Sequence, residues 1–97
     1  MTFQPCVYIL ASRRNGTLYT GVTSGLASRI QQHRDGTYSS FTSRYRVDML
    51  VWYELHDTME TAIAHEKRIK RWLRKWKLDL IERDNPNWRD LYEDLNS

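Results

Sequence analysis

The chain has 97 residues, a net charge of +3, and 40% hydrophobic residues. This length supports one domain, expected over residues 1–97, and the composition excludes a wholly disordered chain. The mean hydropathy is −0.72. No apolar run approaches the ~20 residues that a membrane-spanning helix needs.

Cys6 is the only cysteine, which excludes an intramolecular disulfide and a metal site built from several cysteines. We expect it to fill a small space in a strand. The N-terminal residues lack the basic region of a secretory signal peptide. We therefore expect a cytoplasmic protein with no membrane association, and we expect a monomer or a weak homodimer.

Two strands joined by a tight turn are predicted near the start of the chain. Residues 6–11 form an apolar run rich in β-forming side chains, and residues 17–23 resume the pattern. Asn15 and Gly16 stand between them, and this dipeptide is the strongest short-range signal for a hairpin turn. The two segments are therefore expected to pair antiparallel.

A helix is expected to follow, capped by Thr23 or Ser24, running to about Arg34 and stopping at Gly36. The hydroxyl-rich residues 37–43 favour a loop with a short helical turn. Four further elements are expected: a strand over residues 49–53, a long helix opening at residues 57–60, a helix over residues 77–83 after a bend at 73–76, and a short helical piece over residues 88–95. Together they predict an α/β (α+β) domain with a small, three-stranded, mostly antiparallel sheet flanked by helices.

Positive charge is concentrated in residues 66–77, which contain one acid. The bases are Lys67, Arg68, Lys70, Arg71, Arg74, Lys75 and Lys77. Such a stripe can neutralise several phosphates, although a charged helix face is often merely solvated. Trp72 and Trp76 within it can stack on bases or, more commonly, pack into the core.

Glu66 departs most clearly from its surroundings in the sequence. At about 100° per residue it lies within about 20° of Met59 and Leu73, near the centre of an apolar stripe. That stripe comprises Met59, Ala62, Ile63, Ile69 and Leu73. Burying an unpaired carboxylate costs on the order of several kcal/mol. Glu66 is therefore expected either to pair with Lys70 at i+4 or to serve as a site carboxylate.

Four other side chains are candidates for chemistry. Arg29 and His33 are spaced i, i+4 on the first helix and can clamp a phosphate, or they can be ordinary surface residues. Tyr8 and Tyr19 lie on the two hairpin strands and can present hydroxyls for acid–base work, or they can pack as cross-strand aromatics.

The remaining histidines do not suggest a metal site. His56 and His65 fit no metal-ligand spacing. His65 and Glu66 resemble the start of a zinc-protease motif, but Ile69 stands where the second histidine must be.

The ordered set of these residues resembles the GIY-YIG nuclease family. Residues 7–9 (Val-Tyr-Ile) precede residues 19–21 (Tyr-Thr-Gly), and Arg29, His33 and Glu66 follow in order. The likeness extends over essentially the whole chain and is closest to small stand-alone bacterial members related to the N-terminal nuclease domain of the excision-repair endonuclease. The segments 41–45 and 85–88 are also similar to that subgroup.

Two positions depart from the family pattern. Cys6 replaces the first glycine of the motif, and Thr20 replaces the usual aliphatic residue. Neither change removes a catalytic group. Many family enzymes also use an asparagine after the metal-binding glutamate, for which Asn85 and Asn87 are the candidates.

The resemblance implies hydrolysis of a phosphodiester bond at a single Mg²⁺ or Mn²⁺ held by Glu66. Arg29 would stabilise charge on the phosphate. Tyr8 and Tyr19 would position or deprotonate the attacking water, with the identity of the base left open. His33 would support the phosphate or a tyrosine hydroxyl.

We therefore expect a metal-dependent DNA endonuclease of low sequence specificity, serving DNA repair or recombination, with RNA as the other possible substrate. The first alternative is a nucleic-acid-binding module of the same fold that cuts poorly or not at all. The second is a protein–protein adaptor that uses the tryptophan-rich C-terminal part. Backbone contacts are expected from Arg44, Lys67, Lys70, Arg71, Arg74 and Lys75.

Overall fold

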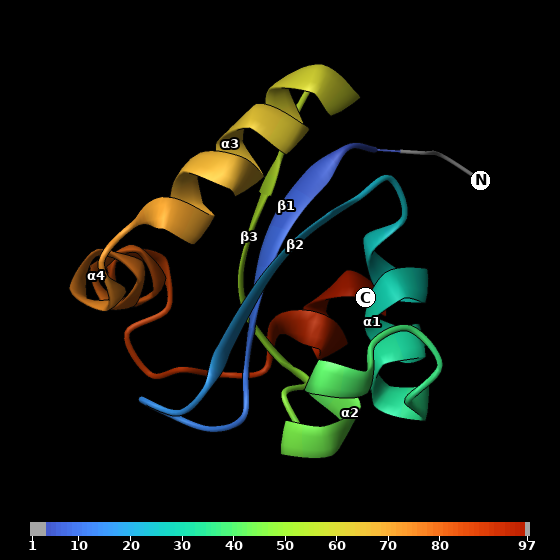
Figure 1. Cartoon of the computed structure of the whole chain (residues 1–97), viewed down its shortest axis with the longest axis vertical. Helices are drawn as coiled ribbons and strands as arrows, with labels where there is room; N and C mark the ends of the chain where they lie inside the picture. Colours follow the sequence, from blue (N-terminus) through green and yellow to red (C-terminus); the bar gives the residue numbers. More distant parts are fainter. Residues whose placement is uncertain (1–3, 97) are drawn as a thin grey trace.

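A computed structural model describes residues 4–96. Figure 1 shows a small sheet with helices on both sides. The elements in chain order are β1 (Cys6–Ala11), β2 (Leu18–Thr23), α1 (Leu26–Asp35), α2 (Ser40–Tyr45), β3 (Met49–Leu55), α3 (Met59–Arg71), α4 (Arg74–Asp84) and the 3₁₀ helix η1 (Leu91–Asn96). The predicted α/β class and three-stranded sheet are confirmed.

The sheet has the order β2-β1-β3, with both pairs antiparallel. β1 is the central strand, and all six of its residues are buried. This explains its continuous apolar sequence, because both faces of a central strand are covered here. β2 is an edge strand, so side chains from the two faces of the sheet can approach each other around its outer side.

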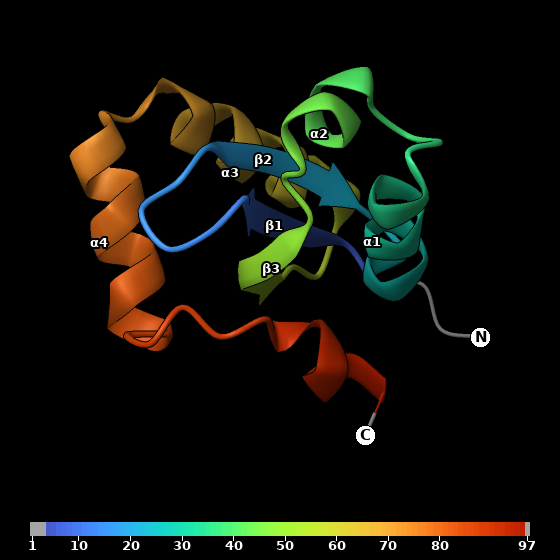
Figure 2. The ribbon, with the colours of Figure 1, turned by 90° about the horizontal axis from the view of Figure 1, so that it is seen from below.

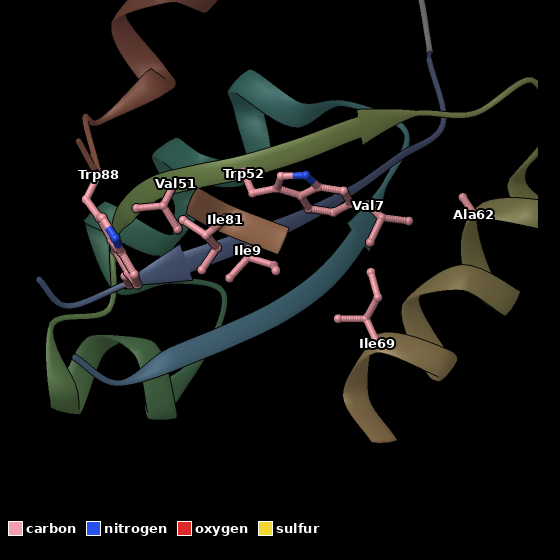
Figure 3. Packing of buried hydrophobic residues seen from close by; sticks show 9 residues of the cluster. Val7, Ile9, Val51, Trp52, Ala62, Ile69, Ile81 and Trp88 are labelled. Atoms are coloured by element: carbon pink, nitrogen blue, oxygen red, sulfur yellow. The ribbon is translucent and has the colours of Figure 1, made fainter. Parts of the chain in front are cut away.

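The helices divide between the two faces. Figures 1 and 2 show α3 and α4 on one side of the sheet and α1, α2 and η1 on the other. Successive β1 side chains alternate between these layers. Val7 and Ile9 join a cluster with Trp52 and with Ile69 of α3 (Figure 3), whereas Tyr8 joins the cluster on the α1 side.

The start of α1 differs from the prediction. The N-cap is Gly25, and no side chain caps the helix. Thr23 is the last residue of β2, and its Oγ1 instead accepts a hydrogen bond from the Gly25 amide at 3.1 Å. The hydroxyl therefore shapes the turn between strand and helix. The predicted stop at Gly36 is confirmed, with a left-handed φ of 77° that suits glycine.

The buried face of α3 is narrower than the predicted apolar stripe. Met59 and Ile63 are each 37% exposed, and Leu73 is 65% exposed. The buried residues are Ala62, Glu66 and Ile69. Leu73 does not continue the buried face of α3, because the helix ends at Arg71. Glu66, at 8% exposed, is thus more buried than Met59, Ile63 and Leu73.

The α3–α4 junction gives the two tryptophans different environments, and only Trp76 departs from the expected core packing. The predicted bend is present, but α4 begins at Arg74, earlier than expected. Trp72 is partly buried against the core, whereas Trp76 is 51% exposed and does not pack there. Within residues 4–96, every helix is too short or too polar to cross a membrane.

Candidate active site

Tyr8 is positioned by a glycine on the neighbouring strand. It pairs with Gly21 of β2, and a Cβ added to Gly21 would lie only 2.4 Å from both Cζ and Oη of Tyr8. The missing side chain therefore leaves the space that the tyrosine ring occupies. Tyr8 is completely buried in this position.

The Tyr8 hydroxyl begins a buried chain of hydrogen bonds. Its Oη lies 2.9 Å from His33 Nε2, and His33 Nδ1 lies 2.8 Å from Thr42 Oγ1. Thr42 donates its single hydroxyl proton to the Ser39 carbonyl, so it accepts from His33. This assigns the proton of neutral His33 to Nδ1 and leaves Nε2 to accept the hydrogen bond from Tyr8.

Burial keeps this chain uncharged. It lowers the pKa of His33 from 6.5 to about 4, and the nearby positive charge of Arg29 adds to the shift. Burial also raises the pKa of Tyr8 well above 10, with a partial offset from the charge and hydrogen bonding of Arg29. Near neutral pH, His33 is therefore a neutral acceptor and Tyr8 a protonated donor.

Arg29, Tyr38 and Tyr19 form the more accessible layer of the cluster. The Arg29 guanidinium carbon lies 3.9 Å from the centre of the Tyr38 ring, a cation–π contact that orients its plane. The Tyr38 and Tyr19 rings lie 4.7 and 5.1 Å from the His33 ring. Tyr38 is 43% exposed, and Tyr19 and Arg29 are half-buried.

Two of these participants were not predicted. Tyr38 and Thr42 belong to the hydroxyl-rich segment that was predicted only as a loop with a helical turn. Their spacing carries no periodic signal, because one lies before α2 and the other within it. The only available signal was the concentration of hydroxyl groups directly after the helix that carries Arg29 and His33.

Glu66 approaches the cluster from the opposite layer. It is 8% exposed, and its Oε2 lies 2.8 Å from Lys70 Nζ, so the i, i+4 pair is present. Burial raises the pKa of Tyr19, and the hydroxyl of Tyr38 and the charge of Glu66 contribute to that rise. Tyr19 on β2 therefore experiences the charges of both Glu66 from α3 and Arg29 from α1.

Glu66 supplies one carboxylate of the kind that a hard divalent cation takes as a ligand. Mg²⁺ typically takes one or two carboxylates and completes its shell with water and substrate phosphate oxygens. Glu66 offers one carboxylate fixed on a rigid helix. Its partner Lys70 has a 51% exposed side chain, so the ammonium group has room to move away from the carboxylate.

The predicted nucleic-acid-binding residues are all exposed: Arg44, Lys67, Lys70, Arg71, Arg74 and Lys75. Arg74 has an additional structural role. Its guanidinium donates to the carbonyls of Asn15 at 2.8 Å and Gly16 at 2.6 Å, so it holds the β1–β2 turn.

The two downstream asparagines differ in environment. Asn85 is buried, and its amide donates to the carbonyls of Val51 and Arg89 and accepts from the Arg89 amide. These bonds fix the turn that follows α4. Asn87 is exposed. The Asn85 side chain is thus committed to structure.

Comparison with known proteins agrees with this arrangement. The GIY-YIG catalytic domain matches residues 4–79. UPF0213 protein SSP2268 of Staphylococcus saprophyticus is 36% identical over 75 residues, which are 77% of this chain and 90% of the relative. UPF0213 protein SH2523 of Staphylococcus haemolyticus is 36% identical over 76 residues, which are 78% of this chain and 92% of the relative. No solved structure gives a significant match. The chain therefore belongs to the GIY-YIG nuclease family.

Proposed function

We propose that this protein is a divalent-metal-dependent endonuclease that hydrolyses phosphodiester bonds in DNA with low sequence specificity. The observation that carries the proposal is that Tyr19 feels the charges of both the Arg29 guanidinium and the buried Glu66 carboxylate, which come from different helices. A carboxylate, a guanidinium and a phenol form a set suited to a phosphate ester. The family to which the chain belongs supports the same reaction class.

Glu66 would hold Mg²⁺ or Mn²⁺. Such an ion, when bound, supplies a Lewis acid for a phosphate oxygen and lowers the pKa of a coordinated water. The role of the protein is to hold this carboxylate rigidly on α3 beside the phosphate-binding groups.

Arg29 is the residue best suited to bind the phosphate. A guanidinium group presents several N–H donors in one plane, matching two phosphate oxygens at once. Its stacking on Tyr38 limits the orientations that it can take. Because these donors are held in place beforehand, they stabilise the negative charge that develops on the phosphate during hydrolysis.

The two tyrosines are assigned different roles. Tyr19 is half-buried and remains protonated at neutral pH, so its hydroxyl is suited to orient the attacking water or donate to a phosphate oxygen. Tyr8 is fully buried and donates to His33. We assign Tyr8 and His33 as positioning residues that hold the surroundings of Arg29, which lies close enough to lower the pKa of Tyr8.

The exposed bases of α3 would bind the DNA backbone beside the site. Lys67, Lys70 and Arg71 recur at the spacing of one helix face and are all exposed. Contacts to phosphates fix the position of a protein on a duplex but carry no sequence information. This supports cleavage with little sequence preference.

Nicking of supercoiled plasmid tests the proposal. The protein is expected to produce open circular DNA with Mg²⁺ or Mn²⁺ and to produce none with EDTA. Salt-dependent DNA binding without nicking under any of these conditions would indicate a non-cutting binding module instead. A labelled RNA duplex in the same assay distinguishes a DNA-directed from an RNA-directed enzyme.

A further inference from the structure

A second group of potential ligands lies where β3 meets α3. Glu54 comes from the end of β3, His56 from the following loop and His65 from the middle of α3. Glu54 Oε1 lies 3.0 Å from His56 Nε2 and 3.1 Å from His65 Nδ1. The two ring nitrogens are themselves 3.1 Å apart. The three atoms form a nearly equilateral triangle.

While Glu54 is ionised, no placement of protons makes all three sides of this triangle hydrogen bonds. If both ring nitrogens carry protons, two donors face each other across 3.1 Å. If either nitrogen lacks a proton, its lone pair faces the carboxylate oxygen, and two acceptors are in contact. A cation that accepts one lone pair from each of the three atoms removes the conflict.

The outer hydrogen bond of His56 favours this arrangement. His56 Nδ1 lies 3.2 Å from Thr61 Oγ1, and Thr61 donates its hydroxyl proton to the Thr58 carbonyl. Thr61 therefore accepts from His56 Nδ1–H. In the neutral ring this leaves the Nε2 lone pair directed at the triangle, as a metal-binding histidine requires.

The distances match a small transition-metal ion. Ligands bound to zinc at 2.0–2.1 Å in a tetrahedron are separated by about 3.3 Å, close to the sides of this triangle. Imidazole suits Zn²⁺ and its neighbours in the first transition row better than it suits Mg²⁺ or Ca²⁺. Two imidazoles and one carboxylate would leave at least one coordination position for water.

We propose that Glu54, His56 and His65 bind one zinc-class divalent transition-metal ion. This site is separate from the one proposed at Glu66, although His65 and Glu66 are adjacent in sequence. Side chains of successive helical residues point about 100° apart. The His65 ring accordingly packs against Trp52 of β3, whereas Glu66 pairs with Lys70. A metal here joins the end of β3 and the following loop to the helix that carries Glu66.

Metal binding by the full chain tests the proposal. Zn²⁺ is titrated in competition with a chromophoric chelator, and Co²⁺ is titrated while its visible absorption is recorded. We expect saturation at about one ion per chain, with a Co²⁺ spectrum that reports nitrogen and oxygen ligands. Zn²⁺ should also raise the melting temperature, because it binds the folded chain preferentially.

Variants distinguish this site from others on the protein. His56→Gln and His65→Gln should each weaken Zn²⁺ binding by at least about 10-fold. Glu60→Gln, an exposed acid at the start of α3, is the matched control and should bind normally. Glu66→Gln should also retain Zn²⁺, which separates this proposal from the proposed nuclease metal.

Two results would overturn the proposal. One is the absence of saturable Zn²⁺ and Co²⁺ binding by the parent chain, which would mean that the three side chains meet without a metal. The other is unchanged binding in both histidine variants. Because His56 lies in a loop, a folding defect confined to His65→Gln leaves the His56→Gln comparison decisive. Neither result depends on nuclease activity.

Discussion

Tyr8 Oη lies 2.9 Å from His33 Nε2, although the two residues stand 25 positions apart and belong to different elements. The bond is buried and joins the central strand to α1, one helical turn beyond Arg29. His33 is in turn fixed by Thr42, so the donor and acceptor roles along the chain are set. The resulting network connects the strand motif to the phosphate-binding helix.

Removing the two tyrosine hydroxyls separately should give different results. Tyr8→Phe should lower the free energy of unfolding by about 1–2 kcal/mol, because His33 Nε2 loses its buried donor. Tyr19→Phe should leave stability nearly unchanged, because its ring is only half-buried. Both should reduce plasmid nicking strongly. Urea unfolding and nicking rates measure the two effects, and parent-level nicking by both variants would show that the tyrosines only pack.

The low pKa of His33 makes stability depend on pH. The unfolded histidine titrates near 6.5 and the folded one near 4, so between these values the unfolded chain binds more protons. Stability contributed by neutral His33 is therefore present above pH 6.5 and lost as pH falls toward 4. Between pH 7 and pH 5 the loss is about 2 kcal/mol.

His33→Gln should remove that part of the pH dependence. The difference in unfolding free energy between pH 7 and pH 5, measured in urea for the parent and the variant, isolates it from the titration of carboxylates. Equal losses in the two proteins would mean that His33 is already protonated in the folded state at pH 5.

Gly21→Ala tests the close approach of Tyr8 to the edge strand. The new Cβ would lie 2.4 Å from the tyrosine ring carbon and hydroxyl, so one of them must move. We expect a loss of about 1–3 kcal/mol in stability, together with reduced nicking. Gly25→Ala is the comparison variant, since a Cβ there meets nothing within 4 Å; it should cost at most about 1 kcal/mol, because alanine is a poorer N-cap than glycine. Equal melting temperatures for the two variants would contradict this packing.

Charge neutralisation on α3 should weaken DNA binding regardless of sequence. In the triple variant Lys67→Gln, Lys70→Gln and Arg71→Gln, the slope of log K against log salt should fall by about 0.9 for each phosphate that is no longer neutralised. Arg74 is left intact because it holds the hairpin turn. Arg83→Gln, an exposed base on α4, serves as the control. A slope equal to that of the parent would place the DNA elsewhere.

Local sequence signals predicted most of the fold. Asn15 and Gly16 marked the hairpin, Gly36 marked the end of α1, and the apolar run of β1 identified a strand. They failed at the α1 N-terminus, where the Thr23 hydroxyl bonds to the following turn rather than capping the helix. They also failed at Leu73, because a break in the helix interrupts a periodicity that continues in the sequence.

Side-chain groupings across elements were predicted only where an ordered motif existed. Tyr8, His33 and Glu66 were selected from such a motif, and the structure joins Tyr8 to His33. The spacing of His56 and His65 fits no metal motif, yet the chain brings them together with Glu54. Their proximity depends on the direction in which α3 leaves β3, a tertiary property that spacing along one element does not encode.

The most direct measurement is nicking by Glu66→Gln in Mg²⁺ and Mn²⁺, beside the parent and Glu60→Gln. The substitution preserves side-chain size and removes the charge that would hold the cation. The variant loses the ion pair with Lys70, but a neutral amide costs less to bury than a carboxylate. The unfolding free energy without metal should therefore change by about 1 kcal/mol or less. We predict that nicking falls at least about 100-fold, equivalent to about 2.7 kcal/mol in the barrier, while Glu60→Gln cuts normally. Nicking by Glu66→Gln at the parent rate would contradict the assignment and leave Glu66 as only the structural partner of Lys70.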